Sequence, residues 1–245
     1  MPHAFNCRPK KEILRRVEKD LRKVDKKVLS MSNSSDPYPP MERNKKLTRE
    51  VLRLLCKHQH PTLIITKSDI VARDIDILNA MPSAVLFSIT TLSDAYKKLE
   101  PNAPPPNKRL GALKKLRKKG VPAGIRLDPL IPGISLDMDN VVKSAGKAGA
   151  LHITTSTFKP RPDAWKRFEN TFPKIARKTR KLFFEEGERI QGSRYLPKKL
   201  RLDMLNQVKE LVIENGMTFG VCREGLNLTK AESCDGSHLC YKHTK

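Results

Sequence analysis

The chain has 245 residues, which is enough for one α/β domain or two small domains, and its 38% hydrophobic fraction suffices for a single core. The net charge of +23, from 49 basic and 26 acidic residues, favours a polyanionic partner such as nucleic acid, while a solvated lysine-rich surface is the alternative. No apolar run approaches the ~20 residues of a membrane span and the start is too charged for a signal peptide, so we expect a cytoplasmic protein without a membrane partner.

Helical and strand patterns alternate through the first part of the chain. An amphipathic helix is predicted over residues 9–27 and a strand over 28–32, followed by a rigid loop of small polar residues and prolines. Predicted helices over 48–56 and 69–81 flank a buried strand at 62–65. Five cysteines without secreted-type spacing indicate reduced thiols.

The stretch from residue 84 to residue 133 is predicted to form a strand, a proline-rich loop, a helix capped by Asn107 and a second strand over 121–131. A strand–helix–strand unit with this crossover is parallel and right-handed. A further helix capped by Asp137 and a fifth strand over 151–156 complete a regular alternation. We therefore predict an α/β fold with parallel strands.

The pattern changes at residue 160. An aromatic helical stripe is followed by a basic helix over 175–184, an amphipathic helix over 200–213 and a short strand over 218–222. We therefore divide the chain into a partial barrel, residues 1–159, and a mainly helical extension, residues 160–245, with a final short strand and a tail that carries cysteine and histidine.

Polar residues at strand ends are the candidate ligand contacts, because active sites of parallel α/β folds lie at the carboxyl ends of strands. Lys67 follows a buried strand; it suits a carboxylate or phosphate, or it reaches solvent as a surface lysine. Ser88 and Thr90 lie two residues apart, so we expect them to face the same side of the sheet.

Arg126 interrupts an otherwise apolar strand, and a charge in that position needs an anionic partner. Three interpretations stay open. Arg126 pairs with Asp128, pairs with Asp36, or clamps an anionic ligand.

The tail holds thiols and imidazoles, which are ligands for zinc or for an iron–sulfur centre. The candidate metal ligands are Cys222, Cys234 and Cys240, with His238 and His243 nearby. Their spacing matches no paired CxxC knuckle, so the alternative is a structural turn over residues 234–238.

Short stretches in chain order, from about residue 10 to residue 240, form a recognisable set. They are 35–42 (SDPYPPME), 65–68 (ITKS) with 73–78 (RDIDIL), 87–92 (FSITTL), 99–104 (LEPNAP) with Arg109-Leu110, 120–124 (GVPAG), 129–133 (PLIPG), 222–225 (CREG) and 234–239 (CDGSHL). Together they resemble the spore photoproduct lyase-like branch of the radical S-adenosylmethionine (SAM) enzymes, also called DNA repair photolyase-like.

The resemblance implies a partial (βα)6-type barrel that binds SAM and a [4Fe–4S] cluster. A 5′-deoxyadenosyl radical would form with an external electron donor, for lyase-type chemistry on nucleic acid. The implied cofactor-binding residues are Ser34 and Asp36 near the methionine amino group, Lys67 at the methionine carboxylate, Ser88 and Thr90 at polar groups of SAM, Arg126, and Ile131 at the adenine. The catalytic residues stay unknown.

The sequence departs from the family in one respect, because it contains no CxxxCxxC motif. Cys7 stands alone before the first helix, and the next cysteine, Cys56, falls inside a predicted helix. We therefore expect the first strand and the cluster loop to be missing, the cluster ligands to lie upstream, and this chain to be inactive. The alternatives are a degenerate, non-enzymatic nucleic-acid-binding α/β protein and a metal-binding module built on the tail cysteines.

Overall fold

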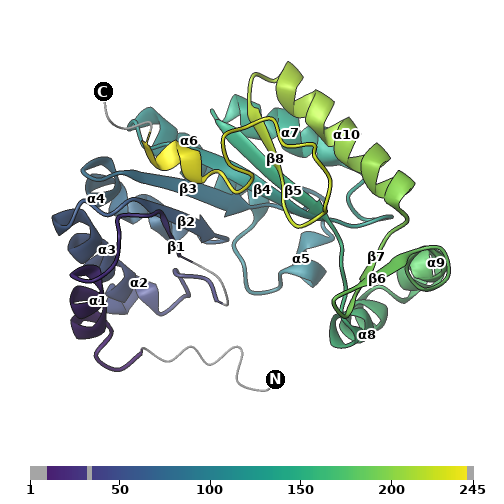
Figure 1. Cartoon of the computed structure of the whole chain (residues 1–245), viewed down its shortest axis with the longest axis horizontal. Coiled ribbons are helices and arrows are strands. Elements are labelled where there is room, and N and C mark those ends of the chain that lie inside the picture. Colours follow the sequence, from purple (N-terminus) through teal and green to yellow (C-terminus); the bar gives the residue numbers. More distant parts are fainter. Residues whose placement is uncertain (1–9, 32–34, 242–245) are drawn as a thin grey trace.

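The computed structural model describes residues 10–31 and 35–241. Its main feature is a sheet of six parallel strands (Figure 1). The strands follow one another across the sheet in chain order: β1 (Leu29–Met31), β2 (Thr62–Thr66), β3 (Ser83–Ser88), β4 (Ala123–Leu130), β5 (His152–Thr157) and β8 (Thr218–Val221). The predicted α/β fold with parallel strands is confirmed.

Helices connect the strands, as a parallel sheet requires. Before β5 they are α1 (Ile13–Leu21), α2 (Glu42–Lys45), α3 (Leu47–Lys57), the 3-10 helix η1 (Asp69–Asp74), α4 (Ile75–Asn79), α5 (Tyr96–Leu99), α6 (Pro106–Lys118) and α7 (Met138–Lys147). Beyond β5 come α8 (Pro162–Thr171), α9 (Pro173–Phe184), the hairpin β6 (Glu188–Ile190) and β7 (Ser193–Tyr195), α10 (Lys198–Glu214) and η2 (Ser237–Tyr241). None of the helices in the described ranges is long and apolar enough to cross a lipid bilayer.

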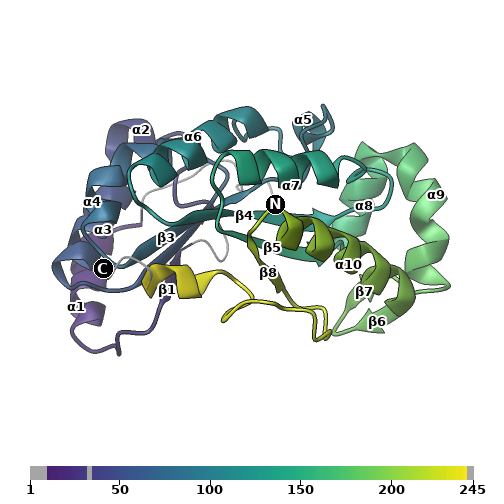
Figure 2. The same ribbon diagram turned by 90° about the horizontal axis from the view of Figure 1, so that it is seen from above.

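Helices α3, α4, α6, α7 and α10 cover one face of the sheet, here called the outer face (Figure 2). Alternate strand residues such as Val85, Phe87 and Ile125 point to this face and are fully buried in the largest core cluster. The amphipathic helices supply the other half of that core through Leu113 and Val142. Burying one large apolar side chain stabilises the fold by about 1.5–3 kcal/mol. This layer is therefore the main source of stability.

The C-terminal segment covers part of the opposite, inner face (Figure 2). Leu239 and Cys240 of η2 pack against Leu63 and Leu86 in a separate small cluster. The approach is close, because a Cβ atom at Gly236 would lie 3.0 Å from the ring of His152. The tail therefore covers one part of the inner face.

Helices α8 and α9 and the β6–β7 hairpin lie beside the sheet as a lobe (Figure 1), and the two helices share a second core cluster with Ile131, Ile134 and Leu196. The hairpin was not predicted, because each strand has three residues, β6 is exposed, and the turn Gln191-Gly192 lacks the usual Asn-Gly signal although both residues have positive φ. The predicted boundary at 159/160 lies between β5 and α8. The predicted last strand, β8, pairs with β5 and completes the main sheet.

Two details of the predicted helices differ from the structure. Helix α6 begins at Pro106, so the predicted cap at Asn107 is wrong; proline has a fixed φ that suits the first turn. The segment predicted as one helix over 69–81 is a 3-10 turn followed by α4. Asp137 does precede α7, but its carboxylate accepts hydrogen bonds from the loop after β3 instead of capping the helix.

Candidate functional site

Asp36 joins the loop after β1 to the end of β2. Its Oδ1 accepts hydrogen bonds from Thr66 Oγ1 at 2.7 Å and from the Tyr38 amide at 2.9 Å, and its Oδ2 accepts one from the Lys67 amide at 2.6 Å. A carboxylate oxygen can accept two hydrogen bonds, so Oδ2 keeps one lone pair after these contacts. The predicted site residue Asp36 is thus a rigid element of the strand ends. Ser34 lies outside the described residues.

A buried ion cluster holds this loop in place. Asp74 is fully buried and accepts hydrogen bonds from Arg49 at 2.8 Å, Arg73 at 2.8 Å and the Tyr38 hydroxyl at 3.1 Å. Burial and then the Asp74 carboxylate raise the pKa of Tyr38 well above its usual value, so the hydroxyl remains a proton donor. The cluster has a positioning role behind the candidate site.

Glu100 connects the ends of β2 and β3. Its carboxylate lies 3.7 Å from Lys67 Nζ and 2.5 Å from Arg109 Nη1, and it accepts a hydrogen bond from Thr90 Oγ1 at 3.3 Å. Arg109 is fully buried and also donates to the Ser88 carbonyl at 2.7 Å. Its second terminal nitrogen, Nη2, has no hydrogen-bond partner among the described residues.

Arg126 pairs with Asp128 at 2.7 Å, so one of the three interpretations is confirmed: the partner is Asp128 and not Asp36. Ser156 on β5 donates to the other Asp128 oxygen at 2.5 Å, and Ser88 is the register neighbour of Arg126 on β3. Burial by itself would lower the pKa of Arg126, but the Asp128 charge, its hydrogen bond and the thiol of Cys222 raise it above the usual value. The guanidinium is therefore a permanent cation.

Glu224 closes the series at the ends of β5 and β8. Its carboxylate accepts hydrogen bonds from the Thr157 amide at 2.6 Å and from Lys159 Nζ at 2.9 Å, and Arg201 Nη1 lies 3.2 Å from it. All of these groups are largely buried. Glu224 ties the last two strands of the sheet to α10.

We call the polar groups at and near the carboxyl ends of β1–β4, which are joined by hydrogen bonds, ion pairs and strand register, the strand-tip network. Its members are Asp36, Lys67, Ser88, Thr90, Glu100, Arg109, Arg126 and Asp128. Five of these eight were predicted as cofactor-binding residues and are brought together. The sequence analysis did not place Glu100 or Arg109 in the site. The feature of the sequence that could have indicated their pairing is that one charged residue stands on each side of a run of prolines.

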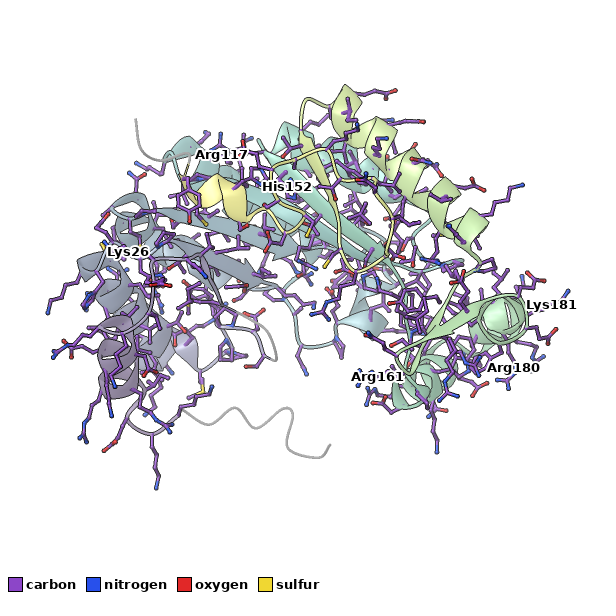
Figure 3. All side chains as sticks on the ribbon, in the orientation of Figure 1. Lys26, Arg117, His152, Arg161, Arg180 and Lys181 are labelled. Carbon is purple, nitrogen blue, oxygen red and sulfur yellow. The ribbon has the colours of Figure 1, made fainter. Side chains whose placement is uncertain are left out.

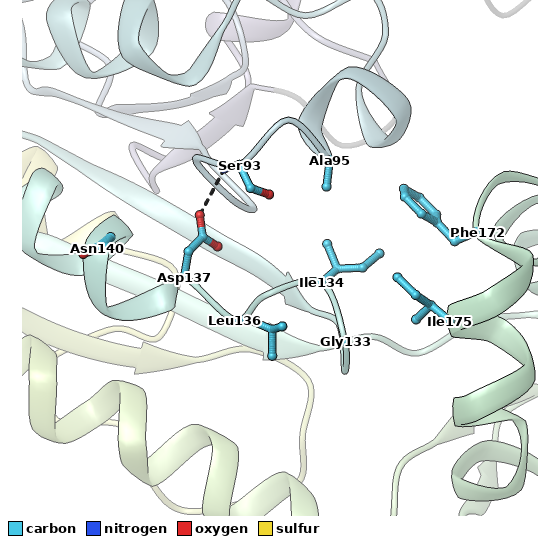
Figure 4. Close-up of a pocket in the computed structure, with 9 residues that line it drawn as sticks. All are labelled: Ser93, Ala95, Gly133, Ile134, Leu136, Asp137, Asn140, Phe172 and Ile175. Atoms are coloured by element: carbon cyan, nitrogen blue, oxygen red, sulfur yellow. Dashed lines mark hydrogen bonds between the residues drawn. The ribbon is translucent and has the colours of Figure 1, made fainter.

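Ile131 and the neighbouring cavity lie apart from this network. Ile131 is buried in the extension's core cluster, and its amide donates to Ser135 Oγ. A cavity of about 360 Å³ lies next to the loop after β4 (Figure 4). Its lining is Ser93, Ala95, Gly133, Ile134, Leu136, Asp137, Asn140, Phe172 and Ile175. None of the predicted site residues lines it, so the adenine contact at Ile131 stays a prediction.

The tail cysteines were predicted as metal ligands. In residues 10–31 and 35–241 the structure gathers no group of three or more histidine, cysteine, aspartate or glutamate residues that could hold a metal ion. Cys240 is buried, and this burial raises the pKa of its thiol to about 12, whereas Cys234 is exposed. The alternative is observed: the Ser237 amide donates to Asp235 Oδ1, and Gly236 has a φ of +80°, which forms a tight turn.

A histidine sits on the inner face beneath that turn. His152 is fully buried between Thr218 Oγ1 at 2.8 Å and Thr154 Oγ1 at 3.1 Å, and its ring meets that of His238 edge-on at 5.1 Å. Burial and then the nearby His238 lower the pKa of His152 to about 3. His152 is therefore neutral at physiological pH and serves as a polar support for the tail.

The chain is similar to known proteins over part of its length. No family model matches the chain. It is 36% identical over 114 residues to an uncharacterized protein of Methanocaldococcus jannaschii, covering 46% of this chain and 43% of that protein. It is 30% identical over 138 residues to an uncharacterized protein of the Acidianus two-tailed virus, covering 52% and 44%. The chain thus spans less than half the length of these curated relatives.

Solved structures of spore photoproduct lyase share the fold. They align with a TM-score of 0.58 at 15% sequence identity, covering 83% of this chain and 62% of the lyase; one contains AdoMet and the dinucleoside spore photoproduct. The chain therefore has the α/β fold found in spore photoproduct lyase.

Proposed function

We propose that the chain binds SAM at the strand-tip network. The observation that supports this most directly is the unbroken line of contacts from Asp36 through Lys67, Glu100 and Arg109 to the Ser88 carbonyl, which joins the ends of β1, β2 and β3. Arg126 on β4 is the register neighbour of Ser88. Ligands of parallel α/β folds bind at this edge. One solved structure of the same fold holds AdoMet.

The residues present fit the polar end of SAM. Lys67 is the accessible cation, with 44% of its side chain exposed and only a 3.7 Å contact to Glu100, so it can turn to a ligand carboxylate. The remaining lone pair of Asp36 suits an ammonium group. The paired Arg126 and Asp128 present one donor and one acceptor group beside Ser88 without a net charge.

An iron–sulfur cluster does not fit the described residues. They contain no group of three or more potential metal ligands, and the sequence has no CxxxCxxC motif. Three thiolates are the minimum that leaves one iron of a [4Fe–4S] cluster open. We therefore derive no radical step for this chain, and the proposal concerns SAM binding.

The substrate class that we propose is nucleic acid. The net charge of +23 favours a polyanion, and the spore photoproduct lyase structures include a complex with a dinucleoside lesion. The same charge favours a second candidate function, nucleic-acid binding without catalysis.

Calorimetric titration of the full chain with SAM tests the first proposal. Lys67→Ala removes a charge-assisted contact worth about 1.5–3 kcal/mol and is expected to weaken SAM binding about 10- to 100-fold. Lys57→Ala is the matched control, since Lys57 is an exposed lysine on α3. No binding by the parent chain, or equal loss in both variants, would overturn the proposal.

Anaerobic reconstitution with iron and sulfide, followed by an assay for 5′-deoxyadenosine, tests whether the chain performs a radical step. We expect no product, because the described residues contain no group that could hold a cluster, and product formation would contradict that expectation. The SAM titration separates the two candidate functions: a chain that binds nucleic acid with a steep salt dependence but does not bind SAM is a nucleic-acid-binding protein without catalysis.

A further inference from the structure

A second cavity, of about 370 Å³, lies in the extension, and none of its lining residues belongs to the strand-tip network. It opens between the start of α8, the end of α9 and the β6–β7 hairpin, and Figure 3 shows Arg161 and Arg180 on this lobe, on the opposite side of the molecule from Lys26. Its lining is Pro160, Arg161, Pro162, Trp165, Arg180, Phe184, Arg189, Gly192 and Arg194. Four of the nine lining residues are arginines, so we call it the arginine pocket.

Two of these arginines have their guanidinium groups over the same aromatic ring. The guanidinium of Arg180 lies 4.8 Å from the centre of the Phe184 ring, and that of Arg194 lies 4.9 Å from it. The Arg194 amide also donates to the Pro160 carbonyl, which ties the hairpin to the start of α8. Cation–π contacts and this anchoring reduce the side-chain freedom that a ligand would otherwise have to remove.

The positive charge of the arginine pocket is poorly compensated. Arg189 and Arg194 lie directly opposite each other in the antiparallel hairpin, an arrangement in which like charges are destabilising. Across the described ranges, Arg161, Arg189 and Arg194 form no ion pair with a carboxylate, and Arg180 has only an exposed contact to Glu169 at 3.9 Å. An anion bound here would offset the repulsion.

Trp165 supplies an independent observation. It lines the pocket and is 5% exposed, and its indole Nε1 is buried without a hydrogen-bond partner among the described residues. Buried N–H donors are nearly always satisfied, and leaving one unpaired costs about 1–3 kcal/mol. The Trp165 ring forms part of the pocket wall and reports on changes in the pocket.

We propose that the arginine pocket is a phosphate-binding site. Guanidinium groups recognise phosphate oxygens through paired hydrogen bonds, and four of them around one cavity match a group with several acceptors and a negative charge. The start of α8 at Pro162 adds the positive end of a helix dipole. Two sources could supply this phosphate: the backbone of a nucleic acid or free inorganic phosphate. The first rests on the proposed function, and the test below separates the two.

The sequence makes the test direct, because Trp165 is the only tryptophan in the chain. Its indole N–H resonance in a nitrogen-15 correlation spectrum of the full chain needs no assignment. We expect this resonance to shift on titration with a thymidine oligonucleotide and, at higher concentration, with inorganic phosphate.

The double variant Arg161→Ala/Arg189→Ala removes two exposed arginines and preserves the Phe184 contacts. We expect it to abolish the phosphate-induced shift and to reduce the salt slope of oligonucleotide binding by about 1.4, for two lost contacts to a single strand. Arg15→Ala/Arg22→Ala is the control, because it removes the same charge from α1, where each arginine is largely exposed. The control should retain the shift.

Each outcome is decisive for the pocket. A shift with either probe that is lost only in the pocket variant supports the proposal, and a shift with phosphate alone supports it while removing the nucleic-acid source. No shift with either probe, or a shift that survives in the pocket variant, overturns it. Oligonucleotide binding combined with no indole shift from either probe overturns the pocket and leaves the proposed nucleic-acid function intact.

Discussion

The strand-tip network and the arginine pocket use the same kinds of charged residue in opposite ways. At the strand tips each arginine has a carboxylate: Arg126 has Asp128, and Arg109 has Glu100. In the pocket, Arg189 faces Arg194 across the hairpin, and neither pairs with a carboxylate of the described residues. Paired charges position a surface before a ligand arrives, whereas uncompensated charges favour an anionic ligand.

The largest expected effect comes from breaking a buried pair at the strand tips. Glu100→Gln leaves the fully buried Arg109 without its counter-charge, and such a change costs about 3–5 kcal/mol. Urea unfolding should show this loss. Arg161→Ala in the pocket should change the free energy of unfolding by less than about 0.5 kcal/mol. Equal changes in the free energy of unfolding for the two variants would contradict the distinction between paired charges at the strand tips and uncompensated charges in the pocket.

The next largest expected effect is a dependence of stability on pH. It arises at His152, beneath the tail on the inner face, and not at the strand tips. The pKa of His152 is lowered from 6.5 to about 3, so as pH falls the unfolded chain binds a proton before the folded chain does. This contribution to stability is complete above pH 6.5 and is lost progressively toward pH 3. Near pH 4.5 the loss is about 3 kcal/mol relative to pH 7.

The measurement is the difference in unfolding free energy between pH 7 and pH 4.5, compared for the parent chain and His152→Gln. The variant lacks the titrating group, so its difference should be smaller by about 3 kcal/mol. His238, Asp235 and Arg126 also act on His152, and they remain in both chains. An unchanged difference would show that His152 is accessible to protons in the folded state.

The seating of the tail can be tested with two glycines. A Cβ atom at Gly220 would lie 2.3 Å from the Cys234 carbonyl, so Gly220→Ala must displace the tail and should cost about 1–3 kcal/mol. A Cβ atom at Gly111 on α6 meets nothing within 4 Å, so Gly111→Ala should be neutral or slightly stabilising. Hydrogen exchange of residues 230–241 locates the effect. Equal stability of the two variants would argue against the packing of the tail on the inner face.

The sequence predicts the sheet well because its signals are local. Buried strands such as Thr62–Thr66 are short apolar runs, and Lys67 and Ser88 are visible as polar residues at their ends. The roles of Glu100 and Arg109 could not be predicted, because they depend on a loop that returns to the strand ends. The pairing of Arg189 with Arg194 could not be predicted for another reason. Strands of three residues are too short for an alternating pattern of apolar and polar residues to be detected.

The smallest expected effect is a gain in stability in the arginine pocket. Arg189→Glu places a carboxylate opposite Arg194 and replaces repulsion by attraction, which is worth about 0.2–1 kcal/mol. The gain should be present at low salt and vanish near 1 M, where the Debye length is about 3 Å. Thermal unfolding at the two salt concentrations measures it. The same substitution should abolish the phosphate-induced shift of the Trp165 resonance, so a gain in stability with loss of binding would show that the hairpin sacrifices stability for its ligand. A loss of stability at low salt would mean that the two arginines do not repel each other, and the electrostatic argument for the pocket would fail.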